Sequence, residues 1–427
     1  MLGVPLLALL ICFAATRTGV LVPQSDRPLP SWLAGPMQQL GFYVSAGVAI
    51  AMLTAIFVLY LIAATLAERV PERMVLGAVI AFNLIVLVGP PLFSTDVFSY
   101  QAYGRLLTIY HTNPYTHGPW AMQLDPIYPY IGAKWITTPS VYGPLFTLLS
   151  GAFAGGSIPF SEISFKVIAA VSSLAVVWML WRAADMRRVS RGRAVALFGL
   201  NPMITLFGVG GAHNDLLMLL FTTAGLYAWL AGRDLSSSTA IVVGTAVKLT
   251  GALVFPFVAV DALRHHGFGE RTRRFVLGAV LSSVLIAVPS FLVFGHGLLQ
   301  MLTTLRDVQR DGQWQSIPGF FLNFFGTPNT VAITSGLGAI FALTAAILLL
   351  QVWRGKLDWI DGAGWATLAI LLSAGSLLPW YVSWLMPLVG LSTSRRLFKA
   401  SMWMCGIAAF MTVITYVPGA VQFLQIL

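Results

Sequence analysis

A carboxylate followed by aromatic and polar residues is the feature of this sequence best suited to chemistry. Asp96 comes directly after a long apolar run, and Thr95 precedes it. A carboxylate in this setting can accept a proton from a sugar hydroxyl as a general base. In a structural role, Asp96 would instead cap the helix that begins here, with help from Thr95, and the two roles are compatible. The residues beyond it that could bind a sugar or an acceptor are Tyr100, Tyr103, Arg105, Asn113 and Tyr115.

His213, Asn214 and Asp215 form a second polar cluster, at the end of another apolar segment. Ionisable residues in such segments are functional candidates, because burying them costs free energy. We expect these residues to bind sugar hydroxyls or a donor phosphate, whereas Asp215 could instead cap the following helix. The cluster lacks the helical spacing of a metal pair, so no metal site is predicted. No cofactor is indicated, although a divalent cation at a phosphate would be compatible with the chemistry.

Lys248 lies inside an apolar run, where a lone lysine usually extends its ammonium group to the membrane interface. Its alternative role is to neutralise the phosphate of a lipid-linked donor, which we favour. Arg306 and Arg310 are further phosphate candidates, unless they only form solvated pairs with Asp307 and Asp311.

Trp380 and Tyr381 follow Pro379 in a late segment that also contains Trp384. Aromatic residues at the end of a membrane span ordinarily anchor it at the interface. The alternative is a platform for a sugar, since pyranose rings stack on aromatic side chains. Both readings remain open for Trp380 and Tyr381.

The elements that position these residues are expected to be membrane-spanning helices. The chain is 57% hydrophobic and 9% charged, too few charges to hydrate the surface of a soluble protein of 427 residues. Apolar runs reach roughly 20 residues and do not alternate with polar residues, which favours helices over a β-barrel. Lys and Arg outnumber Asp and Glu, 25 to 15, which we attribute to cytoplasmic loops rather than to nucleic acid.

Loop charges predict the topology. Residues 185–193, 261–274 and 395–399 are rich in Lys and Arg and are assigned to the cytoplasm. Residues 94–139, with Asp96 and Asp125 against Arg105 and Lys134, and residues 297–329 carry balanced charge and are assigned to the outer side. The first outer loop is expected to extend over residues 94–162. We therefore expect one domain over residues 1–427, an all-α polytopic bundle of about 13 crossings with extra N-terminal spans in residues 1–73. Residues 1–15 are predicted to be a retained span rather than a signal peptide.

This topology requires that two apolar segments do not make a simple membrane crossing. Residues 142–158 are predicted to be a helix at the outer surface, with a full crossing as the alternative. Residues 239–262 are predicted to double back near Lys248. Both expectations follow from keeping the Arg-rich loops in the cytoplasm.

The run at residues 94–105 (STDVFSYQAYGR), with Asn113-Pro-Tyr115, resembles the first outer loop of GT-C glycosyltransferases. It is most similar to polyprenol-phosphate-mannose-dependent α-mannosyltransferases of actinobacterial cell-envelope synthesis. Later segments agree with this family at residues 201–202 (NP), 211–215 (GAHND), 246–251 (AVKLTG), 378–384 (LPWYVSW) and Pro387. The resemblance implies a GT-C fold with juxtamembrane helices in the first outer loop, and it makes Asp96 the catalytic base. Some related enzymes carry histidines in the late loop, and this sequence has none there.

These observations predict a membrane glycosyltransferase that moves a sugar, expected to be mannose, from a polyprenyl-phosphate donor to a glycan or glycolipid hydroxyl. The reaction would invert the anomeric centre at the outer face of the cytoplasmic membrane, with Lys248 or an outer-loop arginine stabilising the departing phosphate. No P-loop or Rossmann fingerprint offers a nucleotide site. The alternative is a secondary transporter, which would place its polar residues at the bilayer midplane, often in repeated halves.

Overall fold

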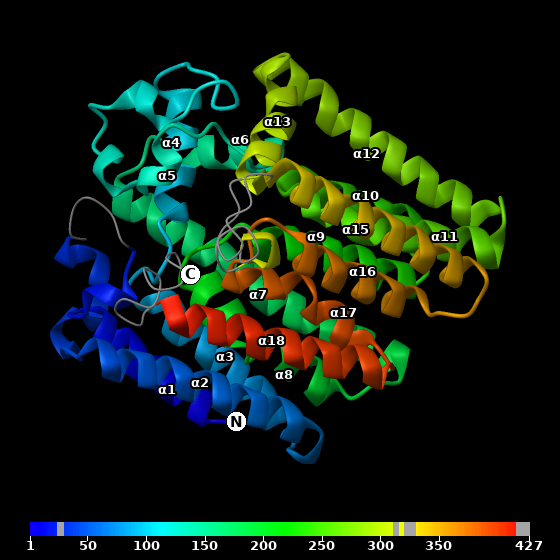
Figure 1. Cartoon of the computed structure of the whole chain (residues 1–427), viewed down its shortest axis with the longest axis horizontal. Helices are drawn as coiled ribbons and strands as arrows, with labels where there is room; N and C mark the ends of the chain where they lie inside the picture. Colours follow the sequence, from blue (N-terminus) through cyan, green and yellow to red (C-terminus); the bar gives the residue numbers. More distant parts are fainter. Residues whose placement is uncertain (24–29, 311–315, 320–329, 416–427) are drawn as a thin grey trace.

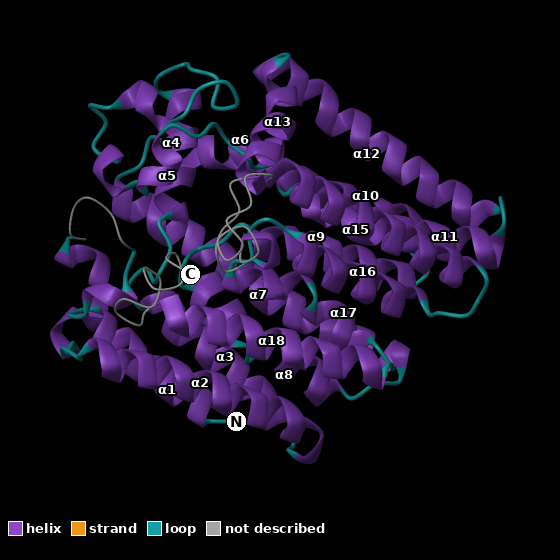
Figure 2. Cartoon of the chain, viewed as in Figure 1, coloured by secondary structure: helices purple, strands orange, loops and turns teal. Residues whose placement is uncertain are grey.

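The computed structural model describes residues 1–23, 30–310, 316–319 and 330–415, and within these ranges it contains helices and no strands (Figure 2). The longer helices are α2 (Ala46–Leu66), α3 (Glu72–Val88), α7 (Ile158–Arg187), α9 (Asp215–Leu230), α12 (Glu270–Phe294), α15 (Thr330–Trp353), α16 (Trp359–Ser373) and α18 (Arg395–Thr415). The shorter helices are α1 (Gly3–Ala15), α4 (Asp96–Thr108), α5 (Ala133–Ile136), α6 (Pro144–Phe153), α8 (Arg191–Gly199), α10 (Asp234–Val247), α11 (Phe255–His266), α13 (Gly297–Arg310) and α17 (Met386–Leu391).

The helices form one bundle with distinct ends (Figure 1). Helices α4, α5 and α6 gather at one end, whereas α11 and the start of α12 lie at the other. One core of buried apolar side chains extends from Val4 in α1 to Ala409 in α18. The N-terminal helices therefore pack into the same core as the rest of the chain.

The chain is a multi-pass membrane protein. Among the described residues, five helices are long and apolar enough to cross a membrane, or six if α8 and the π-helix Met203–Val209 form one span bent by 42°. Helix α12 exposes large apolar side chains that are suited to contact with lipid, since Leu285 and Leu292 are 72% and 82% exposed. The other apolar helices of the described residues are 10–17 residues long, shorter than a typical span. The expected number of about 13 crossings therefore stays a prediction.

The chain reverses at Lys248, as the loop charges predicted. Helix α10 ends at Val247, Lys248 is extended, and a 3₁₀-helix leads into α11. The chain beyond the reversal returns to the opposite end of the α9–α10 hairpin. There Arg271 of α12 pairs with Asp234 of α10 at 2.7 Å, and Trp229 of α9 donates a hydrogen bond to Asp261 of α11 at 2.9 Å. The reversal thus carries Lys248 to the end of the α9–α10 hairpin opposite these contacts.

Helix α6 is too short to cross a bilayer. It has 10 residues, a length of about 15 Å against about 30 Å of hydrocarbon. The full crossing considered for residues 142–158 therefore does not fit, while the membrane depth of α6 stays a prediction. Helix α6 packs closely on α4, because a Cβ atom on Gly104 would lie 2.3 Å from the Ser150 carbonyl oxygen.

Gly143, just before α6, joins the first outer loop to the chain reversal. Its N–H donates a 3.0 Å hydrogen bond to the carbonyl oxygen of Val247. A Cβ atom at Gly143 would lie 2.1 Å from the carbonyl oxygen of Ala246, so only glycine allows this approach. The outer loop and the residue before Lys248 are thereby held in register.

Candidate active site

Two chain turns that precede α4 and α9 are tied together and bring their polar residues side by side. The Leu92 N–H donates a 3.0 Å hydrogen bond to the Gly210 carbonyl oxygen. The rings of Phe93 and Phe207 stack with centroids 4.2 Å apart. Phe93 and Ala212 both adopt positive φ angles, 61° and 55°, which are uncommon for residues other than glycine. Such backbone conformations often mark functional sites, and here they flank one.

Asp96 is the first residue of α4, and its carboxylate faces His213. Its N–H donates to the Ser94 hydroxyl oxygen at 3.2 Å, and its Oδ2 lies 3.3 Å from His213 Nδ1. The side chain of Asp96 is 13% exposed and that of His213 only 1%. The cap of α4 is Thr95, which makes no side-chain capping bond, so the capping role considered for Asp96 and Thr95 is wrong. The carboxylate is instead directed into the site.

His213 is fixed from its other side by an aromatic ring. Its imidazole stacks on Trp380, with centroids 3.5 Å apart and planes 18° from parallel. Trp380 is 8% exposed, so the interface-anchor role considered for it does not fit a side chain that is buried against His213. The late segment around Pro379–Trp384 therefore belongs to the same site as Asp96.

Lys248 forms an ion pair with the buried carboxylate of Asp215 beside two aromatic rings. Lys248 Nζ lies 2.8 Å from both carboxylate oxygens of Asp215, and Trp384 Nε1 donates to the same carboxylate at 2.6 Å. The ammonium also lies 4.9 Å from the Tyr381 ring centroid. Asp215 is not the cap of α9, which is Asn214 and makes no side-chain capping bond. The capping role considered for Asp215 is therefore wrong, and the Lys248 ammonium is paired with Asp215 rather than standing alone.

Tyr100 lines the buried side of this site. Its hydroxyl oxygen accepts the Asn214 N–H at 3.4 Å, and its ring contacts Tyr142 edge-on at 5.0 Å. Burial, and then the negative charges of Asp96 and Asp215, raise the pKa of Tyr100 well above its ordinary value of 10.0. Tyr100 therefore stays protonated at physiological pH and can act only as a neutral group.

The other predicted sugar-binding residues of the first outer loop hold that loop together. Arg105 Nε donates to Asp125 at 2.9 Å, and its Nη1 donates to a backbone carbonyl. Asn113 Nδ2 donates to a backbone carbonyl of α12 at 2.7 Å. The hydroxyls of Tyr103 and Tyr115 donate to backbone carbonyls at 2.8 and 2.9 Å. These groups form the framework of the loop and do not line the cavity beside Asp96.

Arg306 and Arg310 lie on α13, away from Asp96. Arg310 Nη1 is 3.8 Å from Asp307, as considered for a solvated pair, and neither arginine lines the cavity. Helix α13 is linked to the segment before Trp380 through Gln309, whose side chain accepts the Gly375 N–H at 2.9 Å. Asp311 and residues 320–329 of the late outer loop lie outside the described residues.

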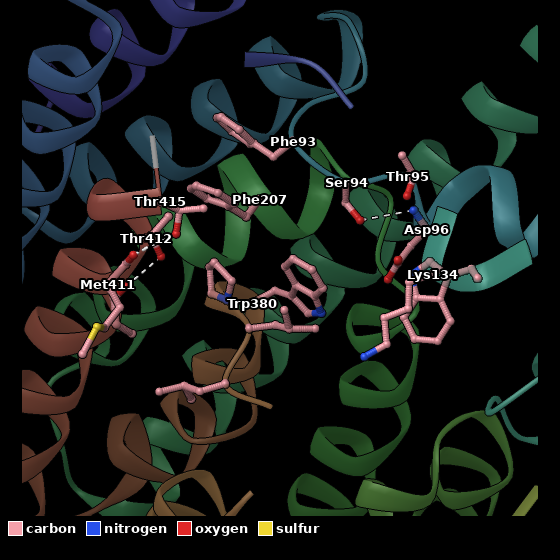
Figure 3. Close-up of a pocket in the computed structure, with 15 residues that line it drawn as sticks. Phe93, Ser94, Thr95, Asp96, Lys134, Phe207, Trp380, Met411, Thr412 and Thr415 are labelled. Atoms are coloured by element: carbon pink, nitrogen blue, oxygen red, sulfur yellow. Dashed lines mark hydrogen bonds between the residues drawn. The ribbon is translucent and has the colours of Figure 1, made fainter. Parts of the chain in front are cut away.

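A cavity of about 280 Å³ opens beside Asp96, between α4, α5, α18 and the segment before Trp380 (Figure 3). One part of its lining is polar and the other apolar. The lining residues are Phe93, Ser94, Thr95, Asp96, Lys134, Trp135, Phe207, Leu377, Leu378, Pro379, Trp380, Ala408, Met411, Thr412 and Thr415. Sequence reasoning missed Lys134 and Phe207 as site residues. The sequence feature that could have indicated Lys134 is a cation next to Trp135 in an outer loop rich in aromatic residues.

Several of the buried polar atoms that have no hydrogen-bond partner among the described residues lie on the segments around Asp96 and Lys248. Such atoms are rare in proteins and often mark places where a ligand or water is bound. They include His213 Nε2, both polar atoms of the Asn214 amide, and the hydroxyls of Ser99, Thr250 and Ser383. No three His, Cys, Asp or Glu side chains come together as a metal site in the described part of the chain. The unpartnered amide, imidazole and hydroxyl groups are suited to hydroxyl-rich ligands.

Comparison with known proteins identifies the family of the chain. Residues 2–264 match the family described as alpha-(1->6)-mannopyranosyltransferase, N-terminal domain, and residues 312–426 match the MptB C-terminal domain. The chain is 29% identical over 363 residues to alpha-(1->6)-mannopyranosyltransferase A of Mycobacterium tuberculosis, covering 78% of this chain and 68% of that protein. It is 24% identical over 467 residues to alpha-(1->6)-mannopyranosyltransferase B of Corynebacterium glutamicum, covering 96% and 74%.

No solved structure gives a significant match to the chain. The match to the N-terminal domain alone covers more than half of the sequence, and the relatives come from mycobacteria and Corynebacterium. The chain therefore belongs to the actinobacterial alpha-(1->6)-mannopyranosyltransferase family of glycosyltransferases, the family that its outer-loop motifs resemble.

Proposed function

We propose that this protein transfers mannose from a polyprenyl-phosphate-mannose donor to a hydroxyl of a glycan or glycolipid acceptor. The observation that carries the proposal is the Asp96 carboxylate, which borders a cavity on one side and faces buried His213 on the other. Transfer to a hydroxyl needs a group that takes the hydroxyl proton, and a carboxylate so held can do this. The names of the relatives support mannose as the sugar and a 6-hydroxyl as the attacking group.

In the proposed reaction, Asp96 accepts the acceptor proton while the acceptor oxygen bonds to the anomeric carbon. The bond between that carbon and the phosphate oxygen breaks, and polyprenyl phosphate leaves with the electron pair. A single displacement inverts the anomeric centre, so a β-linked donor gives an α-linked product. His213 acts as a positioning residue, because its contact with Asp96 and its stack on Trp380 restrict how the carboxylate can turn.

Three groups beside Asp96 are suited to bind the sugar. The Asn214 amide and His213 Nε2 have hydrogen-bonding capacity that no described protein group uses. Trp380 lines the cavity, and the buried Tyr100 accepts a hydrogen bond from the Asn214 N–H. Sugar recognition by protein combines such hydrogen bonds with stacking on an aromatic face.

The membrane setting of the proposal is a GT-C-like bundle of about 13 crossings, with α4, α5 and α6 as juxtamembrane helices on the outer face of the cytoplasmic membrane. A lipid-linked donor suits a cavity that has one wall on the membrane helix α18. The transporter considered from the sequence loses its basis, since the chain belongs to a family of glycosyltransferases.

The test is mannosyl transfer by purified protein in nanodiscs, with radiolabelled polyprenyl-phosphate-mannose and a pool of mannoside acceptors. Asp96→Asn should lower kcat by about 10²–10⁴-fold, the usual contribution of a general base. Asp307→Asn, which changes a carboxylate that is 70% exposed on α13, is the matched control and should retain wild-type turnover. Wild-type turnover by folded Asp96→Asn protein would remove Asp96 from the role of base.

A further inference from the structure

We propose that Lys134 binds the phosphate of the donor and that the apolar wall of the cavity beside it receives the first units of the prenyl chain. This inference rests on the proposed function and adds to it the residue that recognises the lipid phosphate. The phosphate candidates taken from the sequence were Lys248, Arg306 and Arg310. Lys134 differs from all three because its side chain lines the cavity beside Asp96.

The position of Lys134 is fixed by a close approach between α5 and the start of α4. Gly132, which precedes α5, lies so near Thr95 that a Cβ atom would come within 2.6 Å of the Thr95 hydroxyl oxygen. Lys134 follows two residues later and extends into the cavity at the end where Asp96 lies (Figure 3). The base and the ammonium group therefore come from neighbouring helices and border one space.

Charge distinguishes this lysine from the other candidates. Among the described residues that line the cavity, Asp96 is the acidic one and Lys134 the basic one. Lys248, Arg306 and Arg310 do not line the cavity. An anionic phosphate in this cavity would meet Lys134, and an ammonium group is a suitable point charge for it.

The remaining wall is apolar and belongs to the membrane-spanning part of the chain. Ala408 and Met411 come from α18, one of the helices able to cross the membrane, and Leu377 and Leu378 complete the surface. A ligand that satisfies both walls must carry an anionic group and a hydrocarbon chain. A polyprenyl phosphate has this chemistry, whereas a nucleotide sugar would set a polar nucleoside against Leu377, Leu378 and α18.

In the transfer reaction the same contact would act on the leaving group. As the anomeric carbon separates from the phosphate oxygen, negative charge grows on that oxygen, and a nearby ammonium lowers the free energy of this state. Lys134 would thus touch the substrate and contribute to both donor binding and turnover. Asp96 would thus act on the attacking hydroxyl, and Lys134 on the leaving phosphate, in the same displacement.

The experiment compares binding of polyprenyl phosphate and of the uncharged polyprenol to full-length protein in nanodiscs, by quenching of tryptophan fluorescence. Lys134→Gln should weaken polyprenyl phosphate binding by about 10–100-fold, the value of a charge-assisted contact, and leave polyprenol binding unchanged. Lys134→Arg should retain most of the preference for the phosphate. Lys356→Gln, an exposed lysine in the loop between α15 and α16, is the matched control.

An unchanged preference for polyprenyl phosphate in Lys134→Gln would overturn the proposal. Equal loss of phosphate and polyprenol binding would also overturn it, since this outcome means a general disturbance of the cavity. Binding does not depend on turnover, so the two proposals can fail separately. A wild-type protein that transfers no mannose but binds polyprenyl phosphate through Lys134 would overturn the proposed function alone.

Discussion

His213 Nδ1 lies 3.3 Å from Asp96 Oδ2, and the histidine side chain is only 1% exposed. The ring is stacked on Trp380, so it cannot turn away from the carboxylate without breaking that stack. The contact joins the first residue of α4 to the turn before α9. A carboxylate held in this way has fewer orientations to lose when an acceptor hydroxyl arrives.

His213 should therefore matter for turnover more than for donor affinity. We expect His213→Ala to lower kcat by about 10–100-fold, the cost of a misplaced catalytic group, with little change in KM for the donor. The measurement is steady-state mannosyl transfer at several donor concentrations. His117→Ala, which changes an exposed histidine of the first outer loop, should behave as wild type. A rise in KM at constant kcat would instead make His213 a donor-binding residue.

The ion pair between Lys248 and buried Asp215 predicts that removing the lysine charge lowers the stability of the protein. Lys248→Met should destabilise the protein by about 3–5 kcal/mol, because it leaves the Asp215 carboxylate buried without its cation. Adding Asp215→Asn should recover part of this loss. Thermal unfolding in detergent tests both variants. Unchanged stability together with weaker donor binding would identify Lys248 as a phosphate ligand after all.

The close approach at Gly143 predicts that even a methyl group is harmful there. Gly143→Ala should cost about 1–3 kcal/mol, the usual range for overpacking, because its Cβ would lie 2.1 Å from the Ala246 carbonyl oxygen. The resulting shift of the backbone at Ala246 and Val247 should also lower mannosyl transfer, because Lys248 is the next residue in the chain. Gly155→Ala, where a Cβ atom would meet nothing within 4 Å, is the matched control. Equal stability of the two variants would show that the outer loop and the reversal are not coupled.

The raised pKa of Tyr100 predicts a stability that falls at alkaline pH. The unfolded chain loses the phenolic proton above the ordinary pKa of 10.0, whereas burial keeps Tyr100 protonated in the folded protein. The unfolded state then binds fewer protons, so the free energy of unfolding decreases as pH rises past about 10. Tyr100→Phe should reduce this slope in thermal unfolding between pH 9 and 11, while the exposed Tyr43→Phe should not. An unchanged slope in Tyr100→Phe would contradict the assignment.

The sequence predicted what depends on local composition. Apolar runs indicated the membrane helices, and loop charges indicated the reversal at Lys248. Asp96 and His213 were each recognised as candidates because a polar residue at the end of an apolar run is conspicuous. Their contact could not be predicted, because it depends on how two distant turns pack through Leu92 and Gly210.

The sequence was less informative wherever a side chain's role depends on its partner. Arg105 looked suited to a sugar but is paired with Asp125, and Lys248 looked suited to a phosphate but is paired with Asp215. Spacing along the chain does not reveal either pairing, since both partners are more than a helical turn away. Lys134 was counted only as a balancing charge of the outer loop, because its place in the cavity depends on the contact of α5 with α4.

The apolar wall that α18 gives to the cavity has a consequence for how the enzyme meets its substrates. Under the proposed function, the lipid donor travels in the plane of the membrane, while a water-soluble acceptor comes from the bulk. Donor supply is then set by the mole fraction of polyprenyl phosphate-mannose in the bilayer, not by its amount per volume. Adding lipid to the bilayer at fixed total donor should lower the rate per enzyme molecule, whereas diluting the buffer at a saturating acceptor concentration should not.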